Sequence, residues 1–173
     1  MTGTPKEVLG AYTGLTGKSP LPPLWSFGLW MSRITYKSEA EAREVAAALK
    51  THRIPCDVIH LDTGWFEEDW LCNYKFSPSR FDDPKKMIED AQPRGVSRLP
   101  LADPVFHAEN ELFSELVPRG LAVKNADGQL PTDDAVLDFS NPDTVEWYAE
   151  KLGGLFELGV SAIKADFGEA APL

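Results

Sequence analysis

The stretch Asp-Val-Ile-His-Leu-Asp (57–62) is a short apolar run that ends on a carboxylate, which is typical of a buried strand. It follows residues 39–51, whose Glu- and Ala-rich sequence predicts a helix from intrinsic propensity. A second run of the same form, Ser-Ala-Ile-Lys-Ala-Asp (161–166), follows a helix predicted from about 140 to 158. Because strands alternate with helices, the pattern favours a parallel sheet with helices outside it.

The other elements are predicted from prolines, caps and periodicity. The residues around 25–30, Trp-Ser-Phe-Gly-Leu-Trp, are interpreted as a buried strand after a proline-rich entry. Residues 6–16 are interpreted as a short helix or an irregular lead-in. We expect helices at 85–90 and 111–118, a turn at 124–128, N-caps at Ser38 and Ser140, and a C′ glycine at Gly159.

Composition limits the class of protein. The chain has 173 residues, a formal net charge of −10 and 43% hydrophobic residues, so we expect one globular domain over residues 1–173. The acidity argues against a nucleic-acid partner, and no apolar run is long enough to span a membrane. The N-terminus lacks the apolar core of a signal peptide, so we expect a cytoplasmic protein. No motif for a metal, a nucleotide or a redox cofactor occurs, so none is expected.

Two carboxylates, Asp62 and Asp166, follow predicted strands directly. A flavodoxin-like sheet and a (β/α) barrel both fit the pattern, and both gather polar chemistry at the carboxyl ends of strands. Lys164 lies two residues before Asp166, so the two side chains share a face of the strand, and its ammonium would keep the carboxylate ionised. The alternatives are helix-capping aspartates and a salt bridge at a sheet edge.

Between these strands lies an aromatic and acidic loop. It carries Trp65, Phe66, Trp70 and Tyr74 beside the acids at 67–69, a mixture that suits carbohydrate, and we expect one or two of these rings to be purely structural. His60 is interpreted as a packed core histidine, and Cys72 as a small packing residue.

Five motifs together resemble glycoside hydrolase family 31, and most closely its bacterial α-xylosidase and α-glucosidase members. They are Leu-Pro-Pro-Leu-Trp-Ser-Phe-Gly-Leu-Trp (21–30), His-Leu-Asp-Thr-Gly-Trp (60–65), Phe-Asp-Asp-Pro-Lys-Lys-Met-Ile (81–88), Asp-Phe-Ser-Asn-Pro-Asp (138–143) and Ile-Lys-Ala-Asp-Phe-Gly-Glu (163–169). The last motif is the most specific, since it resembles the family's nucleophile motif on the fourth barrel strand.

The resemblance implies a retaining α-glycosidase that uses neither a metal nor an organic cofactor. It assigns Asp166 as the nucleophile and Asp62 as the acid that holds sugar hydroxyls. Lys164 would line the same pocket, with Trp70 and Trp65 as aromatic contacts to an oligosaccharide or α-glycoside. The resemblance implies that full-length relatives can form oligomers, and it implies no membrane partner.

The resemblance also implies an incomplete enzyme. A (β/α)8 barrel needs about 250 residues, and this chain supplies about the first four βα units, without the family's β-sandwich or second half-barrel. We therefore expect the acid/base to lie outside this chain and Glu169 to have a supporting role. We also expect the chain alone to be inactive and to have low stability.

Residues 91–109 depart from the family pattern. Three prolines and an internal Arg would make a poor central strand, so the third strand is expected to be disturbed. A neighbouring reading frame of 96–108 can encode Phe-Arg-Val-Ser-Leu-Trp-Gln-Ile-Pro-Tyr-Phe-Thr-Pro, which suggests a compensated frameshift. Leu101 would then stand where a pocket Trp belongs.

Two other functions remain open: a carbohydrate-binding remnant that keeps Asp62 and the aromatic residues, and a non-functional gene fragment. The choice among α-xyloside, α-glucoside and α-galactoside is also open. Ile34 and Tyr36 are candidates for contributing to it.

Overall fold

A computed structural model describes residues 2–68, 70–91, 97–102 and 105–166, the stretch 97–102 through its backbone only. In chain order the elements are α1 (Pro5–Thr16), the 3-10 turn η1 (Leu24–Phe27), β1 (Trp30–Arg33), α2 (Glu39–Thr51), β2 (Val58–Leu61), α3 (Pro84–Ala91), β3 (Ser97–Ala102), β4 (Val105–His107), α4 (Phe113–Leu116), β5 (Asp134–Val136), α5 (Pro142–Glu157) and β6 (Lys164–Ala165).

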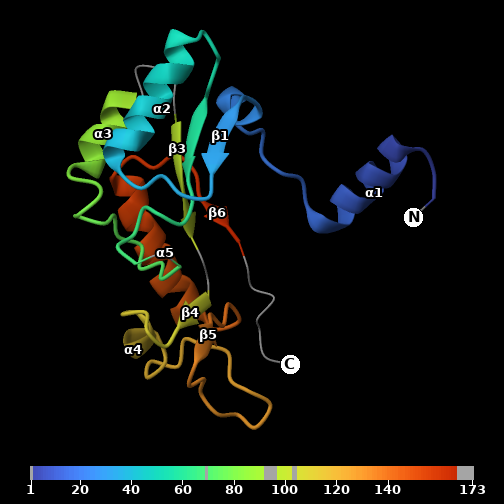
Figure 1. Cartoon of the computed structure of the whole chain (residues 1–173). Helices are drawn as coiled ribbons and strands as arrows, with labels where there is room; N and C mark the ends of the chain where they lie inside the picture. The colour runs from blue at the N-terminus through green and yellow to red at the C-terminus, as the bar shows by residue number, and fades with distance from the viewer. Residues whose placement is uncertain (1, 69, 92–96, 103–104, 167–173) are drawn as a thin grey trace.

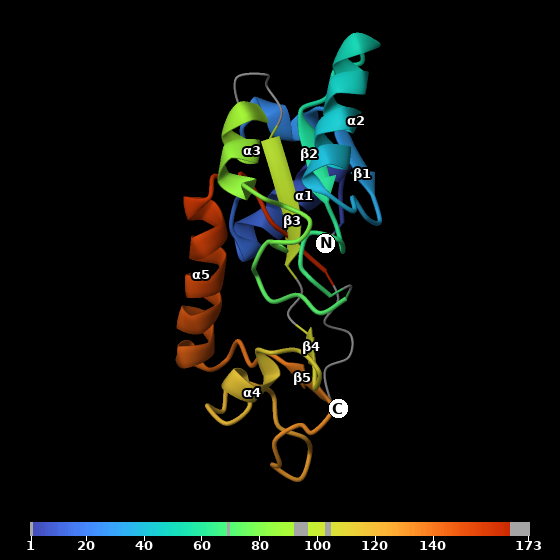
Figure 2. The same cartoon turned by 60° about the vertical axis from the view of Figure 1, so that its left-hand side comes forward.

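The main sheet is parallel, in the order β1-β2-β3-β6. Helices α2, α3 and α5 lie on one side of it (Figures 1 and 2). Ile59 and Leu61 of β2 are fully buried in the core, and Leu155 of α5 joins the same cluster. The predicted alternation of strands and helices, and the parallel sheet that it favours, are therefore confirmed.

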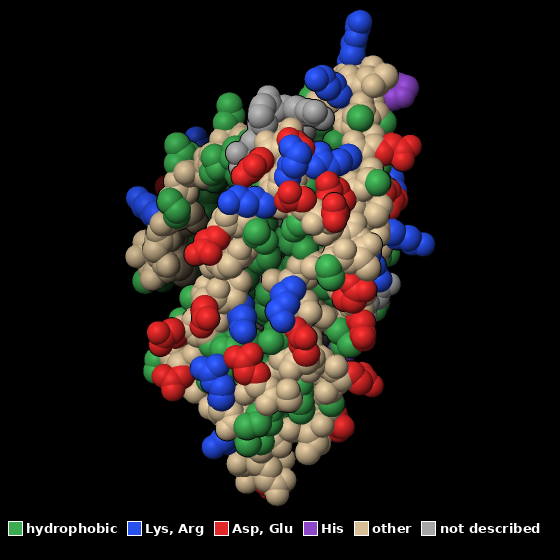
Figure 3. All heavy atoms as spheres, turned by 90° about the vertical axis from the view of Figure 1, so that its left-hand side faces the viewer, with side chains coloured by type: hydrophobic (Ala, Val, Ile, Leu, Met, Phe, Trp, Pro, Cys, Tyr) green, Lys and Arg blue, Asp and Glu red, His purple; other side chains and the backbone are tan. Residues whose placement is uncertain are grey.

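The helix side of the molecule carries mixed charge (Figure 3). Arg43 of α2 joins Glu39, one turn earlier, at 2.7 Å and Asp90 of α3 at 3.1 Å. The first ion pair lies within α2 and the second joins the outer faces of α2 and α3, whose apolar faces pack toward the sheet.

A segment that we call the excursion, residues 105–141, lies between β3 and helix α5 in the sequence. It contains the short helix α4 and the antiparallel ribbon β4–β5, which lies beyond the end of the main sheet (Figure 1). The predicted turn at 124–128 closes on a hydrogen bond from Gly128 N to Asn125 O at 2.9 Å. Helix α5 then returns the chain to β6.

Three local predictions were wrong. The stretch 25–30 is not one strand, because residues 24–27 form η1, whose Gly28 N donates to Trp25 O, and β1 begins only at Trp30. The N-cap of α5 is Asn141 rather than Ser140, since the Asn141 side chain accepts from Asp143 N at 3.0 Å. The helix expected at 111–118 is a single turn, α4.

The backbone of β3 takes the centre of the sheet despite its proline. Pro100 stands opposite Leu61, and β3 pairs with β2 at four positions and with β6 at two. Pro100 supplies no N–H, so this central strand lacks one of the backbone donors that a strand without proline would have. The side chain of Leu101 lies outside the described residues, and the frameshift hypothesis stays a prediction.

Helix α1 stands apart from the sheet (Figure 1) and contributes no buried residue. Its N-terminus is nevertheless well specified, because Thr4 and Glu7 form a reciprocal capping box. In the described part of the chain, no helix is long and apolar enough to cross a membrane.

Candidate active site

The polar residues of the predicted site gather on one face of the sheet, at the carboxyl ends of β2 and β6. Ser32 and His60 are direct partners in the β1–β2 register, so their side chains share a face. Alternation carries this face on from His60 to Asp62, and on the other strand from Lys164 to Asp166. The helices cover the opposite face.

Lys164 joins the two strand-end carboxylates. Its Nζ lies 2.8 Å from Asp166 Oδ2 and 3.4 Å from Asp62 Oδ2, so one ammonium bridges both acids. The hydrogen bond to Asp166, with the charge of Asp62 adding to it, raises the pKa of Lys164 and holds this side chain protonated. Asp166 itself is open to solvent, with 45% of its side chain exposed. The expected closeness of Lys164 and Asp166 is confirmed by this geometry.

His60 extends the cluster toward β1. Its Nδ1 lies 2.8 Å from Ser32 Oγ and 3.8 Å from Asp62 Oδ2. The imidazole is 5% exposed, as expected for a packed histidine, and this burial lowers its pKa. It also lines a cavity of about 460 Å³ together with Trp30, Ser32, Ile163 and Lys164. The contact between His60 and Asp62 was not predicted from the sequence, although their two-residue spacing places both side chains on one face of the strand.

The aromatic loop after β2 divides into core and surface. Trp65 is fully buried and packs against Phe66 and Phe76, with ring centroids 5.5 and 4.9 Å away. No face of the Trp65 ring is open to a sugar, so the expectation that it contacts substrate is corrected to a core role. Phe66 and Tyr74 are buried as well, which makes three structural rings rather than one or two.

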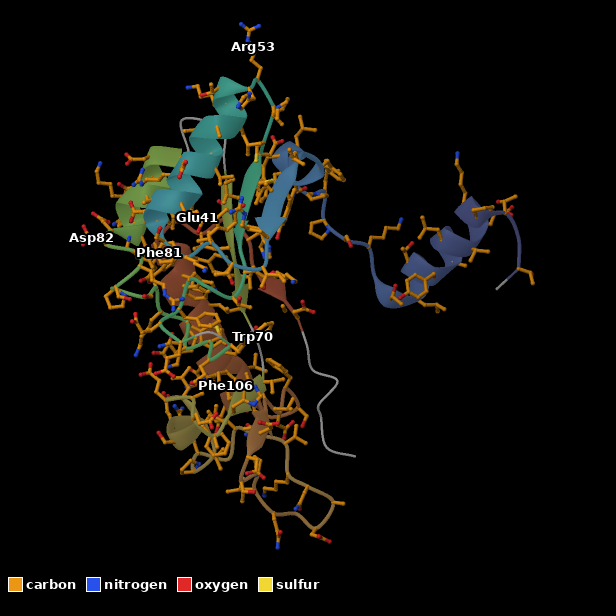
Figure 4. All side chains as sticks on the ribbon, in the orientation of Figure 1. Glu41, Arg53, Trp70, Phe81, Asp82 and Phe106 are labelled. Atoms are coloured by element: carbon orange, nitrogen blue, oxygen red, sulfur yellow. The ribbon has the colours of Figure 1, made fainter. Side chains whose placement is uncertain are left out.

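Trp70 is the aromatic residue of this loop that faces solvent. It is 54% exposed, has a positive φ of 70° and lies beyond the carboxyl end of the sheet (Figure 4). Positive φ is rare for a bulky residue and is retained where the surrounding structure fixes it. More than half of this side chain is therefore open to solvent.

Arg80 and Glu67 hold the loop in place. The Arg80 guanidinium donates to the backbone carbonyls of Phe66 and Glu67 at 3.4 and 3.0 Å. The hydroxyls of Ser77 and Ser79 donate to the Glu67 carboxylate, and these hydrogen bonds lower the pKa of Glu67. A local sequence pattern does not predict this network, because its partners are ten or more residues apart.

Other candidate residues are placed less centrally. Ile34 is largely exposed at the end of β1, whereas Tyr36 is buried in the core. Glu169 and Asp69 lie outside the described residues. Cys72 is buried, as its packing role predicts, and is not disulfide-bonded. Among the described residues, no three His, Cys, Asp or Glu side chains gather as metal ligands would.

The fold and the site define a class: an α/β domain whose acids and lysine meet at the carboxyl ends of parallel strands, the catalytic edge of (β/α) barrels. Residues 19–173 match the family described as "Glycosyl hydrolases family 31 TIM-barrel domain". The chain therefore belongs to glycoside hydrolase family 31, as the motifs predicted.

Curated relatives include an α-xylosidase, XylQ, of Lactiplantibacillus pentosus, 35% identical over 98% of this chain. "Alpha-glucosidase 2" of Bacillus thermoamyloliquefaciens is 33% identical over 96% of it. A Flavobacterium johnsoniae family 31 dextranase, solved with glucose, superposes with a TM-score of 0.88 at 30% identity, over 98% of this chain and 22% of its own. The chain spans 23% and 22% of the two curated relatives.

An α-xylosidase from a soil metagenome, solved with xylose, has a TM-score of 0.86 at 23% identity, which shows the shared fold. The sheet of this chain nevertheless remains open in the part that the structure describes, with β1 and β6 at its edges. The prediction of a partial (β/α)8 barrel is confirmed.

Proposed function

We propose that these residues form the nucleophile half of a retaining α-glycosidase site for α-xylosides or α-glucosides. A carboxylate oxygen of Asp166 attacks the anomeric carbon, the bond to the leaving group breaks, and a glycosyl-Asp ester forms. Water later cleaves that ester. Asp62 accepts hydroxyl groups of the bound sugar, and Trp70 covers an apolar sugar face.

The observation that carries this proposal is the Asp62–Lys164–Asp166 bridge. A nucleophile must be ionised and open to its substrate, and Asp166 has both an ammonium at 2.8 Å and a half-exposed side chain. The relatives named above as xylosidase and glucosidase support the substrate class.

Retention also needs a second carboxyl about 5–5.5 Å from the nucleophile, acting as acid and then as base. We assign Asp62 to hydroxyl binding and propose that the acid/base is not among the residues described here. The chain alone is accordingly expected to form the ester only with substrates whose leaving group departs without a proton.

A cytoplasmic location stays part of the proposal.

A 5-fluoro-α-glycosyl fluoride tests the nucleophile, since fluoride leaves as an anion. Intact mass and peptide mapping of the full chain should show one sugar on Asp166, after incubation with the xylosyl or the glucosyl probe. Asp166→Asn should abolish the label, and Asp127→Asn, in an exposed turn, should leave it unchanged.

Labelling elsewhere than Asp166, or none at all, would overturn the glycosidase proposal. The exposed Trp70 favours one alternative, a carbohydrate-binding remnant. Saturable binding of xylose or glucose without labelling, lost in Trp70→Ala, would establish that alternative instead.

A further inference from the structure

His60 is a buried polar residue that the proposed chemistry does not use. Its side chain is more than nine-tenths buried, and among the described residues its Nε2 has no hydrogen-bond partner. Its other nitrogen, Nδ1, faces two oxygens, Ser32 Oγ at 2.8 Å and Asp62 Oδ2 at 3.8 Å. The two nitrogens therefore have very different surroundings.

This asymmetry selects where the imidazole carries its hydrogen. A buried N–H without an acceptor is rarer and more costly than a buried lone pair, which disfavours hydrogen on Nε2. A hydrogen on Nδ1 can be donated to the Ser32 oxygen and is attracted by the negative charge of the Asp62 carboxylate. Both arguments give the same tautomer, a neutral ring with Nδ1–H.

The same geometry orients Asp62. Its Oδ2 lies between the His60 ring on one strand and the Lys164 ammonium, 3.4 Å away, on another. Both contacts are made to the same carboxylate oxygen, Oδ2. A fixed carboxylate loses less freedom on binding than one that rotates.

We propose that His60 is a positioning residue: its Nδ1–H donates to Ser32 Oγ and faces Asp62 Oδ2 at 3.8 Å, and together with the Lys164 ammonium it keeps Oδ2 on the protein side, so that Oδ1 is aimed at a sugar hydroxyl. The sugar-binding part rests on the proposed function. Among the residues whose side chains the structure describes, the charged groups that act on this ring are Asp62, Lys164 and Asp166.

Asn and Gln replacements separate the two ring nitrogens, because an Asn amide reaches the place of Nδ1 and a Gln amide that of Nε2. In the full chain, His60→Asn should keep the probe's KI for labelling Asp166 within about twofold, and His60→Gln should raise it about tenfold, the weight of one hydrogen bond. The maximal labelling rate should change little in both, since Asp166 is untouched. The same replacements at the exposed His52 are the matched controls.

A second measurement does not depend on labelling. The chain has three histidines, so ¹⁵N chemical shifts assigned with the His60 variants report the ring's tautomer directly. We expect a neutral Nδ1–H ring at pH 7 whose shifts change in Ser32→Ala and in Asp62→Asn.

An Nε2–H or doubly protonated ring would overturn the positioning role, whatever the labelling shows. Equal KI values for the Asn and Gln variants would also overturn it. An unlabelled wild-type chain with an Nδ1–H ring that responds to Asp62→Asn would overturn the proposed function while upholding the role of His60.

Discussion

Gly64 is the position where one added methyl group should disturb the site most clearly. It lies two residues after Asp62, and a Cβ built there would come within 2.3 Å of Thr35 Cγ2 and 2.9 Å of Tyr36 O. The second contact is with backbone, which a side-chain rotation cannot relieve. The Gly64→Ala change therefore forces the segments that follow β1 and β2 apart.

The expected magnitude follows from two opposing effects. Overpacking of this kind costs about 1–3 kcal/mol, and the smaller freedom of the unfolded Ala chain offsets at most about 1 kcal/mol. A net loss of about 1–2 kcal/mol corresponds to a melting temperature lower by about 2–8 °C for a chain of this size. Circular dichroism at 222 nm during heating and in urea measures both quantities.

Gly153, in α5, is the matched control because a Cβ there meets nothing within 4 Å. Gly153→Ala should raise stability by up to about 1 kcal/mol through helix propensity. The close-approach argument fails if Gly64→Ala melts at or above the wild-type temperature, or if both substitutions shift it in the same direction.

Three further predictions concern the core, the bridge and acid stability. Trp65→Ala should cost about 3–5 kcal/mol in urea unfolding and the exposed Trp70→Ala no more than about 0.5 kcal/mol; equal losses would contradict their placement. Lys164→Met should slow labelling of Asp166 about tenfold, and Lys164→Arg should slow it less; an unchanged rate in Lys164→Met would count against the bridge. Trp147 Nε1 donates to Glu115 at 2.6 Å and lowers the pKa of Glu115, so this contribution to stability is present above about pH 4.5 and is lost as the pH falls through the folded-state pKa. Urea unfolding between pH 3 and 7 should be less pH-dependent in Glu115→Gln, and the same slope as wild type would refute the assignment.

Elements with strong local signals were predictable from the sequence. Residues 39–51 form α2 with the expected bounds, because Ser38 caps a run of strong helix formers. Residues 25–30 were not predictable, since an apolar aromatic run is compatible with either a strand or a 3-10 turn. Only tertiary packing at Gly28 and Asp57 separates the two.

The candidate site was likewise predictable only in part. Alternation along a strand gives the shared face of Lys164 and Asp166, whereas the burial of Trp65 depends on Phe76 and on the loop held by Arg80. Sequence composition predicts an aromatic sugar contact, but it does not say which ring turns inward. Long-range packing decides that.

The narrow attachment of β6 has a consequence for folding kinetics. This strand pairs with β3 at only two positions, yet it carries Lys164 to Asp62 across 102 residues of sequence. Contacts so distant along the chain form late, after the excursion and α5 have closed the loop between them. Local opening of β6 should also require less free energy than global unfolding, so amide hydrogens at 164–165 should exchange faster than those of β2. The bridge would then be the last part of the main sheet to form and the first to open.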